Sequence, residues 1–408
     1  MATTLASAVQ GLLKNIYLDS PAALTKMYES TPLLAWLPRS YNLGGKSWVQ
    51  AVGSAYDAGV SNTYSNAVAN ANVPDAVNFN MSPVRIYGIR QIDRMLLMMA
   101  NSDQKSFLNL AADKADWVLR TVVQMTHRQL YRSGTGSIGQ RASLSTNTIT
   151  LSNPADVANF WVGLVVVASS TDGGSLRTGS TTVTAVNRDA GTVTVASAAA
   201  ITSFANNDYL YIQGNAANGG TNVAITGLDG WLPSTVTSTP FWGVDRTVDT
   251  ANLAGSRIDA AALGYNARDA AEALITAIQT VNGAPPDILF AHPKVVSVIR
   301  LITSDNQRFP MDVSTGLSDG KTELFLKGFS VDGVPLVADY ACGVSDMYAL
   351  TKSAIELNVV NPSFPELSVP SRDIDSADGI EIRSANYMNL RIKRPIACGR
   401  VSNVPTTI

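Results

Sequence analysis

Cysteine and histidine are nearly absent from this chain, and charged residues are scarce. The 408 residues include 2 cysteines, Cys342 and Cys398, too few for a disulfide framework. The 2 histidines, His127 and His292, have no cysteine or second histidine at ligand spacing, which argues against a zinc site. Charged residues make up 15% of the chain, against about 25% in an average soluble protein. A globular protein rich in Ala, Ser and Thr would show this composition, and so would a subunit whose surface is largely covered by other subunits.

Long apolar runs and clustered basic residues are also missing. The densest apolar runs, 161–168 and 95–100, are far shorter than the ~20 residues of a membrane span. No basic stretch precedes the first apolar residues, so we expect no signal peptide and a protein made in the cytoplasm. The net charge of -2 argues against tight nucleic-acid binding, which needs clustered Lys and Arg. Near-neutrality suits a container that does not adhere to its contents.

Two early segments need a partner for burial. Four apolar residues at helical spacing predict a short amphipathic helix: Leu5, Val9, Leu12 and Ile16. Its apolar stripe must be buried in the chain's own core or in a neighbouring subunit. Residues 41–89 then place strand-like pieces, 46–52 and 84–87, around a middle rich in Asn, Ala, Ser and Gly. We expect these two pieces to pair as the arms of a long projection without a core, which meets a partner or is disordered.

A long helix and a β-rich region follow. The helix is expected to begin at Asn101 or Ser102, to carry Val118 and Val122 on its apolar face, and to end at Gly134, a length of about 45 Å. Strand-like segments then recur, with a hairpin turn at 187–191. They are 148–151, 162–168, 181–186, 192–195 and 209–212. This spacing predicts a small all-β barrel or sandwich inserted between helical segments.

The remainder of the chain has a mixed α+β pattern. Amphipathic helices are expected at 271–281 and at 293–302. Short strands are expected at 287–290, 334–337 and 347–350. The closing segments, 380–383 and 388–394, alternate apolar and charged residues as a half-exposed sheet does.

Two sequence motifs of enzymes occur in the wrong context. Residues 134–139 match the G-x-G-x-x-G pattern of dinucleotide-binding turns, but they follow a helix instead of a strand. Ser318 lies in a G-x-S-x-G pattern, whose catalytic histidine follows the serine in hydrolases. Here His127 and His292 both precede it, so we interpret Ser318 as a loop residue and the histidines as packing or capping residues.

Acidic residues near the C-terminus do not match a metal loop. They are Asp373, Asp375, Asp378 and Glu381. Their spacing misses the calcium-loop pattern, because Ala377 occupies an expected ligand position, and a solvated turn is the better interpretation. We therefore predict no catalytic, cofactor-binding or metal site, and a protein that is not an enzyme.

The order of the parts resembles that of the HK97-fold major capsid proteins of tailed double-stranded DNA bacteriophages. Residues 134–136 and 227–231 resemble two halves of one Gly-rich connection, split by the β-rich region. Further local similarities lie at 287–294 with 305–309 for the A-domain, at 333–337 with 347–350 for its hairpin region, and at 387–394 with Arg400 for the last P-domain strands.

The resemblance implies an α+β, HK97-like fold with an inserted small all-β domain. Its parts would be an N-terminal arm (1–40), an E-loop (41–90), a spine helix with part of the P-domain (91–139), the inserted β domain (140–225), an A-domain (226–370) and C-terminal P-domain strands (371–408). The contacts between subunits are expected from Leu5, Val9, Leu12, Ile16, Lys46, Trp48 and Arg85. In some relatives an E-loop lysine is joined covalently to a neighbour's asparagine. Lys46 is the matching lysine, but no matching asparagine and acid can be placed, so we predict no crosslink.

The implied function is self-assembly through hexamers and pentamers into an icosahedral head. This shell would enclose double-stranded DNA without sequence-specific binding. The implied partners are further copies of the chain, a scaffolding protein during assembly and a portal protein; decoration proteins stay open, and no membrane is involved. The implied location is the virion, after assembly in the host cytoplasm. Two alternatives are an encapsulin-like nanocompartment shell protein and a β-rich adhesin or glycan-binding protein.

Overall fold

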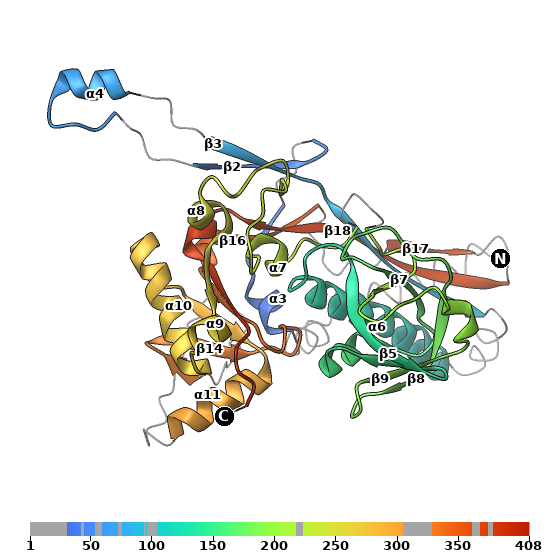
Figure 1. Cartoon of the computed structure of the whole chain (residues 1–408). Coiled ribbons are helices and arrows are strands. Elements are labelled where there is room, and N and C mark those ends of the chain that lie inside the picture. Colours follow the sequence, from blue (N-terminus) through green and yellow to red (C-terminus); the bar gives the residue numbers. More distant parts are fainter. Residues whose placement is uncertain are drawn as a thin grey trace.

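The computed structural model describes residues 31–41, 45–53, 59–71, 76–93, 95, 104–217, 223–304, 329–360, 368–373 and 378–407. Several sequence predictions fall outside these ranges: the stripe at Leu5, Val9, Leu12 and Ile16, the helix start at Asn101 or Ser102, and the motif around Ser318. Within them, the strands form two larger sheets, a closed barrel and a projecting two-stranded hairpin, and the long helix α6 (Gln104–Gln129) lies beside the barrel (Figure 1).

A five-stranded sheet and helix α6 form the centre of the molecule. The strand order is β1-β16-β18-β17, and β4 also pairs with β18. These strands are β1 (Arg39–Ser40), β4 (Val84–Asp93), β16 (Ile355–Val359), β17 (Ser368–Asp373) and β18 (Gly379–Ile392). Helix α6 packs directly on β4 at Gly88, because a Cβ there would lie 2.6 Å from Val122. Val118 and Val122 are buried in this contact, which confirms the predicted apolar face.

The second half of β18 differs from its prediction. Met388, Leu390 and Ile392 are fully buried, but Asn389 on the opposite face is only 1% exposed. The Asn389 amide donates to the Ser82 carbonyl at 2.9 Å and accepts from the Thr226 N–H at 3.1 Å. The strand is therefore covered on both faces at Asn389, and the expectation of a half-exposed sheet is wrong at this position, whereas Arg391 further along the same face is partly exposed. Polar residues fit because the covering backbone supplies hydrogen bonds.

A six-stranded sheet has two buried faces. Its order is β11-β19-β15-β12-β14-β13. The strands are β11 (Ser256–Asp259), β12 (Ile288–Ala291), β13 (Phe329–Val331), β14 (Val334–Ala338), β15 (Met347–Leu350) and β19 (Gly399–Ser402). Leu289 packs with helices α10 (Ala267–Asn282) and α11 (Pro293–Ser304), whereas Ile288 and Phe290 point into the main core. Burial on both sides explains why the central strands β12 (Ile-Leu-Phe-Ala) and β15 (Met-Tyr-Ala-Leu) are continuous apolar runs.

Smaller helices complete the body of the molecule. They are α3 (Pro32–Trp36), α7 (Leu228–Trp231), α8 (Thr250–Ala254), α9 (Ala260–Leu263) and the 3-10 turns η3 (Lys352–Ala354) and η4 (Pro395–Ala397). Helix α10 buries Leu274 and Ile278 as predicted, but Val281 at its end is 45% exposed. The predicted apolar face therefore extends one turn too far. Val281 lies in the last turn of α10, which ends before Gly283, a residue with a φ of 78°.

The β-rich region closes into a barrel of order β10-β5-β6-β9-β8-β7. Its elements are β5 (Ser137–Ser145), β6 (Thr148–Leu151), η1 (Pro154–Asn159), β7 (Val165–Ser169), β8 (Thr181–Asn187), β9 (Thr192–Val195), η2 (Ala199–Ile201) and β10 (Tyr209–Ile212). The predicted strands at 148–151, 192–195 and 209–212 are confirmed, as is the hairpin between β8 and β9. Strand β5 was missed because its sequence, SIGQRASLS, lacks β-branched residues beyond one isoleucine.

The chain enters and leaves the barrel at one place. The Ala224 N–H donates to the Gly134 carbonyl at 3.3 Å, and the Gly227 N–H donates to the Arg132 carbonyl at 2.9 Å. Gly227 has to be glycine, since a Cβ would lie 2.3 Å from the Leu130 carbonyl oxygen. The two Gly-rich segments therefore lie side by side. Treating the barrel as a separate inserted domain stays a proposal.

The projecting hairpin is paired differently from the prediction. Strand β2 (Trp48–Gly53) pairs with β3 (Ala76–Met81), and helix α4 (Tyr64–Asn70) lies at its far end (Figure 1). The predicted partner, 84–87, instead belongs to β4 and pairs with β18. Pro83 separates β3 from β4 and cannot donate a ladder hydrogen bond, so the chain changes sheets there.

Candidate subunit-contact surfaces

The base of the hairpin is anchored in the main core by aromatic side chains. Phe79 on β3 is fully buried, with its ring centroid 5.3 Å from that of Trp231 on α7 and 6.2 Å from that of Phe241. The Asn80 N–H also donates to the Trp242 carbonyl at 3.2 Å. Such aromatic pairs stabilise by about 0.5–1.5 kcal/mol beyond burial itself. The expectation that residues 41–89 lack a core is therefore wrong for the base of the hairpin.

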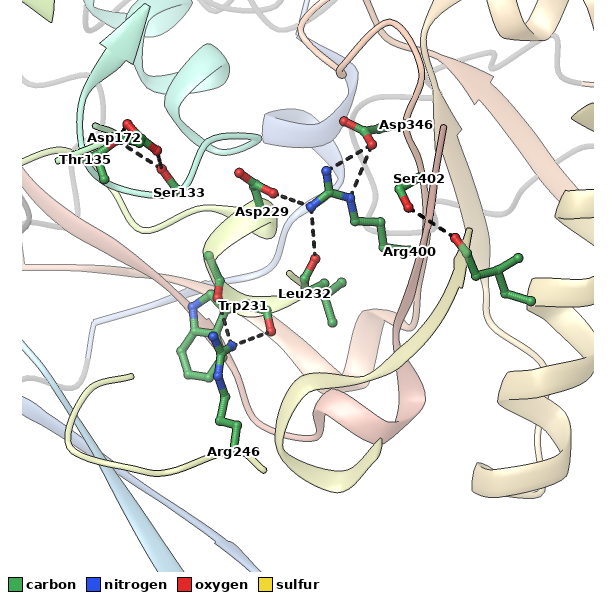
Figure 2. A network of polar contacts seen from close by, with 12 residues as sticks. Ser133, Thr135, Asp172, Asp229, Trp231, Leu232, Arg246, Asp346, Arg400 and Ser402 are labelled. Atoms are coloured by element: carbon green, nitrogen blue, oxygen red, sulfur yellow. Dashed lines mark hydrogen bonds and ion pairs between the residues drawn. The ribbon is translucent and has the colours of Figure 1, made fainter. Parts of the chain in front are cut away.

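A buried arginine network fixes helix α7, and with it the anchor at Trp231. Arg400 on β19 donates to Asp346 Oδ1 at 3.0 Å and pairs with Asp229 on α7 (Figure 2). Burial alone would lower the pKa of Arg400, but Tyr348 and the two carboxylates raise it above its ordinary value. Removing Arg400 would leave both carboxylates without their shared cation, whereas removing either carboxylate would leave the other one paired with Arg400.

A second arginine supports the same helix from below. Arg246 donates to the carbonyl oxygens of Gly230 at 2.9 Å and Trp231 at 3.1 Å (Figure 2). Its guanidinium lies 4.0 Å from the centre of the Phe241 ring. Burial lowers the pKa of Arg246 to about 10, so the side chain is still charged at neutral pH. The base of the hairpin thus rests on a rigid platform.

The far end of the hairpin has the opposite character. Helix α4 has no buried residue. Tyr64 is 86% exposed and Val68 is 56% exposed, and their spacing of four places them on one face of the helix. Val60, just before the helix, is 84% exposed. Burying one such side chain completely is worth about 1.5–3 kcal/mol, so this surface favours contact with a partner.

The central sheet exposes a further apolar face. Along β4, Ile86 points toward α6, whereas Tyr87 and Ile89 point away and are 54% and 56% exposed. Tyr87 meets Tyr387 of β18 edge to face, with ring centroids 6.3 Å apart. Exposed large apolar side chains gathered on one sheet face are typical of interaction surfaces.

A buried carboxylate ties three segments of the body together. Asp339 accepts hydrogen bonds from His127 Nε2 at 2.8 Å, from Tyr131 Oη at 2.9 Å and from the Leu33 N–H at 3.3 Å. Burial would raise the pKa of Asp339, but the hydrogen bond and charge of His127 lower it below its ordinary value. The carboxylate therefore stabilises the fold at neutral pH, and this contribution is lost as the pH falls through its lowered pKa.

The predicted contact residues lie in different surroundings. Lys46 and Arg85 are exposed, and their role in subunit contacts stays a prediction. Trp48 is 3% exposed and packs in the chain's own core. Its indole is therefore not available to a neighbour, and this candidate is corrected. The sequence indicated a strand with an aromatic residue but not which face the body of the molecule would cover.

The interpretation of the two histidines is confirmed. His127 packs inside the core on α6, and His292 caps α11 by accepting the Lys294 N–H at Nδ1, 3.2 Å away. Residues 134–139 lead from α6 into β5, which is not the context of a dinucleotide-binding turn. Across the ranges that the structure describes, no three His, Cys, Asp or Glu side chains gather to hold a metal ion. No described helix combines the length and apolar character that crossing a membrane requires.

Similar proteins were found by structure and not by sequence. No protein-family model and no curated protein matches the chain. A chain in the capsid asymmetric unit of Cyanophage A-1(L) matches with a TM-score of 0.55 and 14% identity, covering 92% of this chain and 93% of that chain. The encapsulin SrpI from Synechococcus elongatus PCC 7942 matches with a TM-score of 0.44 and 11% identity, over 93% and 89% of the two chains. Mycobacterium phage Che8 gives a TM-score of 0.37 and 9% identity, over 88% and 85%.

The likeness to the cyanophage chain shows a shared fold over nearly the full length of both chains. The chain thus shares a mixed α/β fold with that capsid chain, in agreement with the mixed pattern of helices and strands expected from the sequence.

The strongest exposed surfaces were not among the sequence candidates. Tyr64 and Val68 lie in a stretch that the sequence marked only as poor in large apolar residues. Their spacing of four was the available signal. Tyr87 and Ile89 alternate with buried positions on β4, but only the placement of α6 shows which face is left open.

Proposed function

We propose that this chain is the major capsid protein of a tailed double-stranded DNA bacteriophage. Copies of it assemble through hexamers and pentamers into the icosahedral shell of the head. The role is structural and involves no catalysis. The observation that carries the proposal is a hairpin anchored firmly at Phe79 and Trp231 while its far end exposes Tyr64 and Val68. An arm that is anchored at its base and exposes apolar side chains at its end can bury those side chains against a neighbouring copy. The fold shared with a cyanophage capsid chain supports this reading.

The proposed function also assigns a role to each region of the chain and names its interaction partners. Residues 41–90 act as the E-loop, 91–139 as the spine helix with part of the P-domain, and 226–370 as the A-domain. The barrel, within 140–225, is an inserted domain on the shell exterior, since inside it would occupy volume needed by DNA. Further partners are a scaffolding protein during assembly and a portal protein. The shell encloses DNA without sequence-specific binding, assembles in the host cytoplasm and remains in the virion.

Assembly of the purified protein tests the proposal. We expect closed shells by electron microscopy and a fast-sedimenting species by analytical ultracentrifugation, from the chain alone or co-expressed with the scaffolding protein of its own gene cluster. Only monodisperse monomers across a range of salt and protein concentration, with and without the scaffolding protein, would contradict the proposal. The contents of native particles separate the encapsulin-like alternative: double-stranded DNA supports the head, and an enclosed enzyme supports the nanocompartment.

A further inference from the structure

A polar cleft of about 570 Å³ lies between the barrel and the body of the molecule. On the barrel side it is lined by η1 and the residues just before it. On the body side it is lined by the end of α6, the loop between β14 and β15, and the end of β19. Clefts of this size accommodate small-molecule ligands.

The side chains that line the cleft favour a polar ligand. The apolar ones are small, namely Pro154, three alanines, Cys342 and Val344, and the one aromatic ring belongs to Tyr340. Apart from Gly343, the other lining residues are serines, asparagines, aspartates and arginines. A ligand that fits this lining is held by hydrogen bonds and charge, and not by burial of apolar surface.

Two of the three arginines in the cleft have carboxylate partners within the chain. Arg132 pairs with Asp156 of the barrel. Arg400 pairs with Asp346 and with Asp229, and Figure 2 shows its guanidinium between these two carboxylates. These pairs fix the walls of the cleft and compensate the charges of Arg132 and Arg400.

Arg128 is the cation of the cleft without a carboxylate partner. It lies in the last turn of α6, is half-buried, and forms no ion pair with the residues that the structure describes. Burial lowers the pKa of Arg128; the Tyr340 hydroxyl, which hydrogen-bonds it, raises the pKa, and the neighbouring Arg188 and Arg132 lower it. A guanidinium in these surroundings favours an anion, and its fork of N–H donors matches the oxygens of phosphate and carboxylate groups.

Neutral hydrogen-bond donors line both walls of the cleft. Ser152 and Asn153 belong to the barrel side, and Tyr340 and Ser345 belong to the body side. The hydroxyls of Ser152 and Ser345 form no hydrogen bond within the described ranges of the chain. Asn153 accepts the Ala155 N–H at Oδ1, 3.2 Å away, so its NH2 group is left for a ligand. The oxygens of a tetrahedral phosphate can accept from both walls at once, whereas a carboxylate has only two oxygens.

We propose that this cleft binds a small phosphate-bearing anion, with Arg128 and Tyr340 as its partners on the body side and Ser152 and Asn153 as its partners on the barrel side. Free inorganic phosphate and the phosphate groups of a nucleotide share this chemistry. The bound anion links the barrel to the body and stabilises the folded subunit by mass action. All of these residues belong to one subunit, so binding does not depend on assembly.

Calorimetric titration of unassembled subunits tests the site, with inorganic phosphate and ADP as separate probes at constant ionic strength. We expect saturable binding of at least one probe, with a dissociation constant of about 1 mM or lower. Arg128→Gln should weaken this binding about tenfold or more, because the charge-assisted hydrogen bonds are lost. Tyr340→Phe, which removes only the hydroxyl, should weaken it about threefold or more. Arg300→Gln, at an exposed arginine on α11, is the control and should bind as the unchanged protein does.

Each outcome supports or overturns the site. Binding of phosphate assigns a free anion, and binding of ADP alone assigns a nucleotide. No saturable binding of either probe at about ten times the expected dissociation constant would overturn the proposal. A variant Arg128→Gln that is folded by circular dichroism and binds with unchanged affinity would overturn it too, and if that variant does not fold, Tyr340→Phe decides in the same way.

A tetraglutamate peptide is the probe for a carboxylate ligand. If it binds more tightly than phosphate and ADP, and loses affinity in Arg128→Gln, the cleft belongs to an acidic peptide and the phosphate proposal is wrong. Weaker binding of the peptide than of phosphate or ADP supports the proposal. Because every titration uses unassembled subunits, these results are independent of whether the protein forms shells.

Discussion

The hairpin and the barrel both extend from the body of the molecule, but they bury their apolar side chains in different ways. The barrel closes its strands on one another and fills its interior with side chains such as Phe160 and Leu210, each at most 1% exposed. The hairpin has two strands, and only its base reaches a core, through Phe79. Its far end leaves Tyr64 and Val68 in solvent. A two-stranded hairpin is at best marginally stable alone, whereas a closed barrel has no open edge.

The barrel and the hairpin therefore depend on different contacts with the rest of the assembly. The barrel needs the body of the molecule only at its two ends, where the Ala224 N–H reaches the Gly134 carbonyl. The hairpin needs the body at its base and a further surface at its far end. We therefore expect stability to depend on the barrel interior and the hairpin base, and assembly to depend on the hairpin end.

The largest effect is expected from Phe160→Ala. Emptying this site in the barrel should lower the free energy of unfolding of the barrel by about 3–5 kcal/mol. Because the barrel has its own interior, the loss should give a separate, earlier transition in thermal unfolding followed by circular dichroism. The control is Trp161→Ala at the next position, which is 37% exposed and should cost less than about 1 kcal/mol. A single shifted transition for the whole chain would show that the barrel is not an independent unit.

A smaller effect is expected from removing the barrel. Joining Gly134 to Ala224 through a short Gly-Ser linker should give a soluble, folded protein, because these residues are already neighbours. The melting temperature of the remaining body should stay within about 4 °C of its value in the full chain. The contacts that the remaining body loses include the Arg132–Asp156 pair and the hydrogen bond of Ser133 to Asp172. An insoluble deletion variant, together with an unfolded isolated barrel, would contradict this independence.

The smallest effect on stability is expected from Tyr64→Ser. The side chain is 86% exposed, so the free energy of unfolding should change by less than about 0.5 kcal/mol. Assembly should nevertheless be impaired, with fewer closed particles by electron microscopy at the same protein concentration. Val248→Ser is the matched control, since Val248 is 75% exposed and lies outside the hairpin. Equal assembly of the two variants would remove the hairpin end from the proposed contact.

Local patterns predicted much of the fold. The segments at 148–151, 192–195 and 347–350 combine β-branched or apolar residues with turn residues on either side, and each forms the expected strand. The apolar spacing of Val118 and Val122 was sufficient for the long helix. In these elements local propensity and tertiary packing favour the same structure, so short-range reasoning succeeds.

Long-range pairing could not be predicted in the same way. Strands β2 and β3 pair across an intervening helix, and β4 pairs with β18, some 300 residues further along the chain. Nothing local distinguishes this arrangement from the expected pairing of 46–52 with 84–87. The same limit applies to the contact surfaces. Whether Trp48 faces the core and Tyr87 faces solvent depends on other segments of the chain, namely the rest of the main core for Trp48 and helix α6 for Tyr87.

Hydrogen exchange of free subunits and of assembled particles tests the central claim most directly. The account predicts that amides of residues 60–70, around α4, exchange rapidly in free subunits and become strongly protected in particles, because assembly buries this surface. Amides of the barrel strands β6 and β9 should be protected equally in both states, since their hydrogen bonds are internal. Equal exchange of residues 60–70 in free subunits and in particles would contradict the claim that a neighbouring copy completes the hairpin.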